Sequence, residues 1–231
     1  MYTVTQLLFQ CDKTVTYEET PKNKVNYQFV TEGKTLYIFL EPSSGWIDWK
    51  HNFQFKKRPY KDMKIPYKVH RGFLKCWKEI EDIIIAKITE TDDRDNYLFD
   101  TIVTVGYSHG AALAMLCHEC CWFHRQDIID CIYGIGFDGP RVYGGFTVKP
   151  ELKQRWDNFV LVRNNTDIVT HMPPHYFGFT HVGHLLHVGQ DEKYGPIKSH
   201  YSFRIIRSLL KFEVPCDACT LPELLNYIKK G

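Results

Sequence analysis

The chain has 231 residues, of which 44% are hydrophobic, so it can bury one sizeable core, and we expect one domain over residues 1–231. Its formal net charge is +2, so the overall charge of the protein does not favour binding of nucleic acid. No apolar run approaches the length of a membrane span, and the polar, uncharged start does not make a secretory signal. We therefore expect a cytoplasmic protein.

The first third of the chain predicts two strands and a basic loop. Residues 27–30 and 36–40 flank a Glu32-Gly33-Lys34 hairpin signal, and the second of these strands is apolar throughout, as in a central strand buried on both faces. Residues 54–68 mix six cations with aromatic and aliphatic side chains, and two prolines argue against a helix there. Such a loop is often only solvated, but its composition also suits transient contact with an anionic lipid surface.

The next stretch predicts a helix followed by a strand, a sharp turn and a second helix. Residues 69–88 place apolar side chains at helical spacing, which predicts a buried stripe on one face. A β-branched strand over residues 101–105 then leads into Gly106-Tyr-Ser-His-Gly110, and small helix-forming residues follow. Ser108 lies at the apex of this turn.

The Gly-x-Ser-x-Gly pattern in this setting predicts a nucleophile elbow. Glycines two residues before and after the serine allow the strand and the helix to cross closely, and the helix N-terminus directs amide N–H groups toward an oxyanion. The alternative is a glycine-rich turn that enters an ordinary helix.

The remaining segments alternate between predicted strands and helices. The expected elements are a strand within 127–136, a helix at 152–156, a strand at 159–163, a hairpin over 178–189 and helices at 199–211 and 221–230. This alternation predicts a mostly parallel sheet covered by helices, with the site at the carboxyl ends of its strands. Ser108, Asp138, Asp167 and the turn at Ser43 all follow predicted strands, so we expect them at one sheet edge.

A nucleophilic serine needs a general base, and the base needs an acid to orient it. Asp167 is the preferred acid and Asp138 its rival. His200, in a loop just before a helix, is the preferred base. The rival bases are His171, His175, His181, His184 and His187.

The chain has eight cysteines, and buried thiols in a reducing compartment are the simplest interpretation. Two Cys-x-x-Cys spacings leave alternatives open. Cys117, Cys120, Cys216 and Cys219 could form a zinc site, or the last two could form a disulfide.

Several motifs together resemble those of the class 3 (fungal-type, Rhizomucor-like) triacylglycerol lipase family. They are Val69-His-Arg-Gly-Phe73, Gly106-Tyr-Ser-His-Gly-Ala-Ala-Leu-Ala114, Phe137-Asp-Gly-Pro-Arg-Val142 and Val162-Arg-Asn-Asn-Thr-Asp-Ile-Val169, in the family's order within residues 36–203. The resemblance implies an α/β-hydrolase fold, with a central mostly parallel sheet flanked by helices.

The same resemblance implies roles for individual residues. Ser108 would be the nucleophile, Asp167 the acid and His200 the base. The oxyanion hole would consist of the backbone N–H of His109 and the N–H or hydroxyl of Ser43. The lid would fall within Gln54 to Lys68. Pro42 replaces the glycine that precedes the oxyanion residue, which leaves Ser44 as an alternative to Ser43, and Asp138 and Gly139 replace Gly and Ser.

The expected activity is hydrolysis of lipid (acylglycerol) or smaller carboxylic esters through an acyl-enzyme, with no metal and no cofactor. The rate is expected to fall at low pH, with the acid limb of the pH–rate profile near the pKa typical of a histidine. One alternative is acyl transfer to an acceptor other than water. Another is a catalytically silent lipase-like module that binds lipid or a partner. Acyl-chain preference and oligomeric state stay open.

Overall fold

A mostly parallel sheet of seven strands forms the centre of the computed structural model, which describes residues 1–12, 17–41, 55–60, 66–164, 167–189, 195–212, 216 and 218–230. In chain order its strands are β1 Glu18–Glu19, β2 Asn26–Glu32, β3 Thr35–Leu40, β6 Thr101–Tyr107, β7 Ile132–Phe137, β9 Phe159–Asn164 and β10 His184–Val188. Their order across the sheet is β1-β2-β3-β6-β7-β9-β10. From β3 to β10 all neighbours are parallel, and β1 and β2 are antiparallel additions at one edge. The predicted fold class is confirmed.

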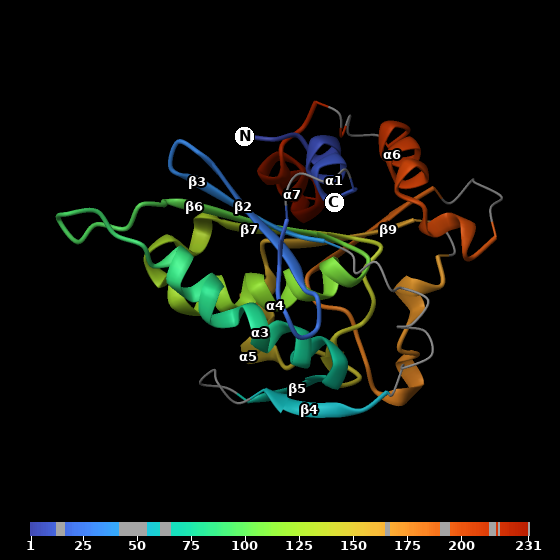
Figure 1. The fold of residues 1–231 in the computed structure, drawn as a ribbon. Helices are drawn as coiled ribbons and strands as arrows, with labels where there is room; N and C mark the ends of the chain where they lie inside the picture. The colour runs from blue at the N-terminus through green and yellow to red at the C-terminus, as the bar shows by residue number, and fades with distance from the viewer. Residues whose placement is uncertain are drawn as a thin grey trace.

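Helices cover both faces of this sheet (Figure 1). One face carries α3 Arg71–Ile88, α4 His109–His124 and α5 Pro150–Lys153, and the other carries α1 Val4–Asp12, α6 Ser202–Leu210 and α7 Leu221–Lys230. Short 3-10 turns complete the connections: η1 Gln126–Cys131, η2 Gln154–Trp156, η3 Val169–His171, η4 His175–Phe177 and η5 Lys198–His200. The N- and C-termini lie on the same side of the sheet as α1 and α7 (Figure 1).

Alternation along the strands divides the interior into two cores. In β3, Leu36, Ile38 and Leu40 belong to the core beneath α3 and α4, whereas Tyr37 and Phe39 belong to the core beneath α1, α6 and α7. A parallel strand with helices on both faces needs apolar side chains at every position, which is why β3 reads as an unbroken apolar run. The expectation of a central strand there is confirmed.

A second, three-stranded sheet lies beyond α3 and was not expected from the sequence. It consists of β4 Lys57–Tyr60, β5 Tyr67–His70 and β8 Tyr143–Gly144, in the order β4-β5-β8. The prediction of a loop is wrong for these parts of 54–68, and the helix predicted from residue 69 begins at Arg71. Pro59 is tolerated because β4 is an edge strand, where a missing amide donor costs little.

The hairpin predicted for residues 178–189 is also wrong. The alternation is real over His184–Val188, but this strand, β10, pairs in parallel with β9 instead of turning back on its own neighbour. Gly178 and Gly183 adopt φ values of 71° and 73°, which break the segment before β10. Alternation of apolar and polar residues indicates a half-buried strand but does not indicate the direction of the strand that pairs with it.

The two Cys-x-x-Cys pairs lie on opposite faces of the central sheet. Cys117 and Cys120 belong to the core beneath α3 and α4, and Cys216 and Cys219 to the core beneath α1 and α7. The sheet separates the two pairs, so the alternative of a zinc site built from all four is wrong.

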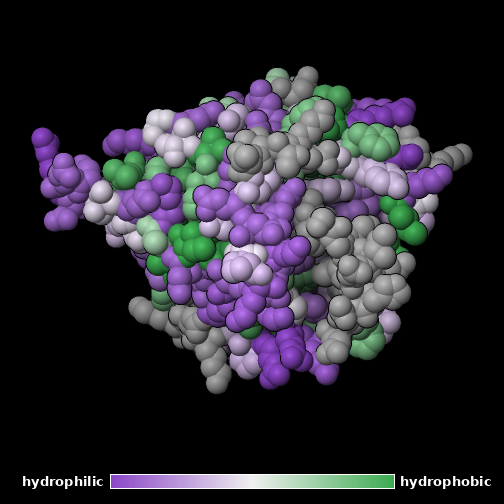
Figure 2. Space-filling view, viewed as in Figure 1, coloured by the Kyte–Doolittle hydropathy of each residue, from purple (hydrophilic) through white to green (hydrophobic). Residues whose placement is uncertain are grey.

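The face seen in Figure 2 is largely hydrophilic, with hydrophobic residues in small separate groups. Its long projection is the loop that joins α3 to β6, where residues 91–98 are all exposed. Among the helices of the described residues, none combines the length and the apolar character that crossing a bilayer requires.

Tyr60 anchors the small sheet to α3, and its loss provides a test of this packing. Its hydroxyl donates to Glu81 (2.5 Å) and accepts from Trp77 Nε1 (2.9 Å), all within the core. Tyr60→Phe should lower the free energy of unfolding by about 1–3 kcal/mol, because it leaves a buried carboxylate without one of its donors. Urea unfolding measures this, with Tyr176→Phe as the control, since Tyr176 is 74% exposed. Equal losses in the two variants would contradict the anchoring role.

Candidate active site

Ser108 occupies a strained turn between β6 and α4. Its φ of 55° and ψ of −119° lie in a region that residues other than glycine rarely adopt. The turn is held by a hydrogen bond from the Ser108 N–H to the carbonyl of Phe137, at the end of β7 (2.8 Å). The serine hydroxyl is thereby presented at the carboxyl edge of the sheet.

The two glycines that flank Ser108 are required by close backbone packing. A Cβ on Gly106 would lie 2.2 Å from the carbonyl oxygen of Gly110, and a Cβ on Gly110 would lie 2.0 Å from the carbonyl oxygen of Leu40 in β3. No side chain fits at either position. The glycine spacing of the motif is therefore required by the close crossing of α4 over β6 and β3.

Three side chains from separate segments form a continuous hydrogen-bonded chain. His200 Nε2 lies 2.8 Å from Ser108 Oγ, and His200 Nδ1 lies 2.7 Å from Asp167 Oδ2. The fully buried Asp167 also accepts the backbone N–H of Val169 on Oδ1 (2.9 Å). With Asp167 as the acceptor, the imidazole proton lies on Nδ1, and Nε2 can accept the proton of the serine hydroxyl.

Two residues that sequence reasoning missed hold the segment that carries His200. The ring of Tyr107 stacks on the imidazole, with centroids 5.2 Å apart, and its hydroxyl donates to the backbone carbonyl of His200. Asn164, at the end of β9, donates from Nδ2 to the carbonyl of Ser199 (2.7 Å). The position of Tyr107 beside the serine was the only sequence signal for its role.

The rival acid, Asp138, lies next to Asp167 at the end of β7. One oxygen of each carboxylate and a ring nitrogen of His200 all lie within 4.8 Å of one another. Asp138 Oδ1 accepts the backbone N–H of Asn164 (2.7 Å), and its φ is 47°. Asp167 is thus the carboxylate bonded to His200 Nδ1, and Asp138 is its buried neighbour.

The rival histidines bond to other groups. His171 contacts the Asp167 carbonyl and Arg163, His175 the Phe146 carbonyl, His181 the Thr170 carbonyl, His184 the Asp157 carbonyl, and His187 contacts Arg163. Among the described histidines, His200 is the one that is hydrogen-bonded to Ser108.

Comparison with known proteins identifies the family. The family model for lipase (class 3) matches residues 37–177, more than half of the chain. This chain belongs to the class 3 lipase family. The resemblance noted in the motifs is therefore confirmed.

Individual relatives of this class 3 lipase family member are fungal. A lipase of Rhizomucor miehei is 29% identical over 155 residues, which cover 65% of this chain and 40% of that protein. The chain thus spans less than half the length of this curated relative. The structure of the Rhizomucor miehei lipase–propeptide complex is similar with a TM-score of 0.63 and 21% identity, covering 90% of this chain and 71% of that one. A triacylglycerol lipase whose catalytic centre is described as a serine protease triad gives a TM-score of 0.62 and 25% identity, covering 76% and 66%.

Of the oxyanion groups expected in this family member, the backbone N–H of His109 lies within the described residues. His109 is the first residue of α4, where backbone N–H groups lack partners within the helix and the helix dipole favours negative charge. Its ring packs near Phe73 (5.6 Å between centroids), and burial, with a smaller effect of His70, lowers the pKa of His109 to about 4. The imidazole is therefore neutral at neutral pH. Ser43 and its alternative Ser44 lie outside the described residues.

The lid expected over Gln54 to Lys68 agrees poorly with the described part of that segment. Residue 54 and residues 61–65 lie outside the described residues. Lys57–Tyr60 and the start of β5 belong to the small sheet, and the rings of Tyr60 and Tyr67 are buried in the core. These strands are anchored beneath α3, so a lid that moves as one piece over 54–68 is not compatible with them.

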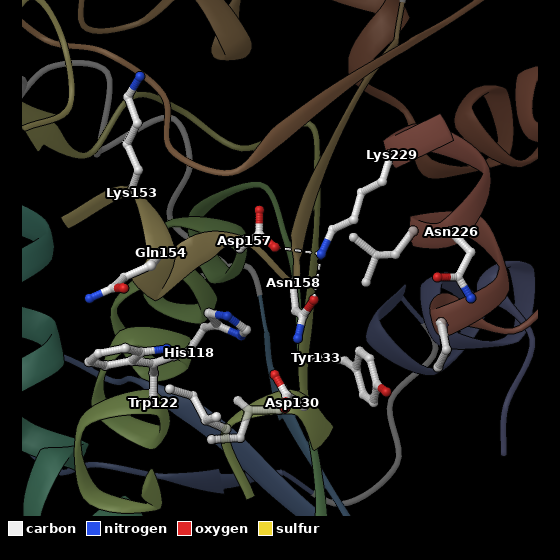
Figure 3. Close-up of a pocket in the computed structure, with 14 residues that line it drawn as sticks. His118, Trp122, Asp130, Tyr133, Lys153, Gln154, Asp157, Asn158, Asn226 and Lys229 are labelled. Atoms are coloured by element: carbon white, nitrogen blue, oxygen red, sulfur yellow. Dashed lines mark hydrogen bonds and ion pairs between the residues drawn. The ribbon is translucent and has the colours of Figure 1, made fainter. Parts of the chain in front are cut away.

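A cleft of about 530 Å³ lies at the amino ends of β7 and β9 (Figure 3), whereas Ser108 follows the carboxyl end of β6. It is lined by the later turns of α4, the start of β7 and α7. Lys229 of α7 bonds Asp157 (2.6 Å) and Asn158 (2.9 Å) within it, so these polar groups join α7 to the turn before β9.

The glycine packing beneath the elbow can be tested directly. Gly110→Ala should lower the free energy of unfolding by about 3 kcal/mol or more, because the new methyl group overlaps the Leu40 carbonyl and the backbone must shift. Denaturant unfolding measures the loss. Gly195→Ala is the matched control, since a Cβ there meets no atom within 4 Å, and it should change stability by less than about 0.5 kcal/mol. A tolerated Gly110→Ala would show that the crossing is looser than the structure indicates.

Proposed function

We propose that this class 3 lipase family member hydrolyses carboxylic esters of lipids, or smaller carboxylic esters, through an acyl-enzyme on Ser108. The observation that carries the proposal is the continuous contact from Ser108 Oγ through His200 to Asp167, at 2.8 and 2.7 Å. A serine hydroxyl becomes a useful nucleophile when a neutral imidazole accepts its proton and a carboxylate stabilises the resulting imidazolium.

In this mechanism Ser108 Oγ attacks the ester carbonyl as its proton moves to His200 Nε2. The oxyanion of the tetrahedral intermediate accepts the N–H of His109, with Ser43 proposed as the second donor, each donor contributing about 2.7–4 kcal/mol. His200 then protonates the departing alcohol, which leaves the acyl group on Ser108. Water, deprotonated by His200, attacks the acyl-enzyme and releases the acid. Asp167 remains ionised and balances the charge of the imidazolium throughout.

Exposed apolar side chains beside the triad support a lipid-like substrate. Ile168 directly follows Asp167, and its N–H donates to the carbonyl of Pro196 (3.2 Å), so the two loops that carry the acid and the base touch. Ile197 and Tyr201 on the second loop and Phe203 at the start of α6 are 52–61% exposed. The class 3 relatives are lipases, and one of the similar structures is a triacylglycerol lipase.

The proposal of transient lipid contact through 54–68 now rests on charge. Arg58 and Lys68 on the small sheet and Lys56 just before it are exposed, whereas Tyr60 and Tyr67 are buried and unavailable to a membrane. Cations without exposed aromatics suit a weak attraction to anionic headgroups that salt screens.

Ester hydrolysis by single variants tests the triad. Ser108→Ala and His200→Ala should each lower kcat/KM for p-nitrophenyl esters by about 10⁴-fold or more, because no other described side chain is hydrogen-bonded so as to replace the nucleophile or its base. His184→Ala is the matched control, since His184 bonds the Asp157 carbonyl and lies outside the triad. A rate unchanged by His200→Ala would overturn the base assignment. The profile over short and long acyl chains separates an esterase from a lipase.

Labelling with an organophosphonate separates the alternative functions, because only an activated serine reacts. Labelling that Ser108→Ala abolishes, together with hydrolysis, supports the proposed function. Labelling without hydrolysis would favour acyl transfer to an acceptor other than water. Neither labelling nor hydrolysis would favour a silent lipase-like module.

The role of His109 is assigned to its backbone, and this gives a further prediction. His109→Leu should keep kcat within about threefold and leave the acid limb of the rate profile in place, because the neutral ring at this position does not titrate near neutral pH. Rates of p-nitrophenyl ester hydrolysis between pH 5 and 9 provide the measurement. A loss of a hundredfold or more would show that the imidazole itself takes part in the reaction.

A further inference from the structure

Two buried carboxyl groups lie side by side at the carboxyl ends of β7 and β9. Asp138 and Asp167 are both fully buried, and one oxygen of each lies within 4.8 Å of the other and of a His200 ring nitrogen. Two buried carboxylates this close cannot both remain ionised at small cost, because each charge disfavours the other and burial disfavours both.

The hydrogen-bond donors around the pair are unequal. Asp167 accepts from His200 Nδ1 (2.7 Å) and from the Val169 N–H (2.9 Å). Asp138 accepts only the Asn164 N–H on Oδ1 (2.7 Å) among the described groups, and its Oδ2 is buried without a recorded hydrogen-bond partner. Donors stabilise an anion, so the negative charge belongs on Asp167.

The charged groups that face Asp138 lead to the same assignment. Burial raises the pKa of Asp138 well above its usual range, and the charge of Asp167 raises it further. Arg163, on β9, acts in the opposite direction with a smaller effect, and His200 lies within the same 4.8 Å cluster.

We propose that Asp138 is a neutral carboxylic acid in the folded protein, and that its Oδ2–H donates a hydrogen bond to the carboxylate of Asp167. Asp138 is then a positioning residue, which orients Asp167 toward His200 and stabilises its charge without adding a second negative charge to the site. The effect on catalysis rests on the proposed function; the protonation of Asp138 does not. The turn is built for this arrangement, since φ of 47° and the bond from Asn164 hold the side chain at the end of β7.

Two substitutions separate a neutral donor from a charged carboxylate. Asp138→Asn keeps an acceptor for Asn164 and a donor for Asp167, so it should retain kcat within about threefold and leave the acid limb within about 0.2 pH units. Asp138→Gly suits the positive φ but removes the donor, so kcat should fall about tenfold or more with KM little changed. An ionised Asp138 would instead make both variants shift the acid limb to lower pH, because each would remove a negative charge that favours the imidazolium.

A second measurement does not depend on ester hydrolysis. An aspartate in the unfolded chain releases its proton above a pH of about 4, whereas a neutral Asp138 keeps its proton in the folded state. Wild-type stability should therefore fall with rising pH relative to Asp138→Asn, with the ratio of the two folding constants changing up to tenfold per pH unit between about pH 5 and 8. Urea unfolding at several pH values measures this ratio. An infrared difference spectrum, Asp138→Asn minus wild type, should show the loss of a protonated carboxyl band.

The outcomes are distinct. A ratio of folding constants that does not change with pH, together with no protonated carboxyl band, would overturn the proposal. If both are seen but Asp138→Gly is as active as Asp138→Asn, the acid is neutral and the positioning role is wrong. Failure of the proposed esterase function leaves the folding and infrared results unaffected.

Discussion

The close passage of α4 over the carboxyl ends of β3 and β6 is the constraint on which the site depends. At Gly110 the helix backbone comes so near the Leu40 carbonyl that no Cβ fits between them, and Gly106 closes the same contact from the strand side. This proximity forces the chain to reverse within the turn and places Ser108 in its positive-φ conformation. It also directs the first amides of α4 toward the point where charge would develop in an acyl transfer. The strain at Ser108, the direction of these amides and the placement of the serine hydroxyl against His200 are consequences of one packing requirement.

The remaining parts of the site are added to this turn by the parallel sheet. Asp167 and His200 follow β9 and precede α6. Asn164, the last residue of β9, bonds Asp138 at the end of β7 and Ser199 beside His200, so it links the ends of both strands to the His200 segment. Tyr107, the last residue of β6, holds the His200 segment from the other side. Hydrogen bonds to backbone groups do most of this positioning, so the distances within the triad are set by main-chain geometry more than by side-chain packing.

Much of this arrangement could be predicted from the sequence, and the parts that could not have a common cause. The strand at β3, the elbow and the helix α4 follow from local sterics and apolar patterning, which are visible in a few consecutive residues. The pairing of β5 with β8 in the small sheet and the parallel partner of β10 were missed because these pairings join segments distant in the chain. Asp167 was preferred over Asp138 as the acid, but both follow strands, and the tertiary structure is what shows that Asp167 bonds His200. Tyr107 and Asn164 act through backbone contacts across the sheet edge, and their residue types carry no motif of their own.

The nucleophile and the base belong to different layers of the molecule. Ser108 directly precedes α4, which is packed between the sheet and α3, whereas His200 leads into α6, which packs with α1, β9 and β10 on the opposite face. A displacement of the α6 layer along the sheet would lengthen the 2.8 Å contact between Ser108 and His200 while both cores stay buried. The geometry of the triad therefore depends on the alignment of two separately packed layers.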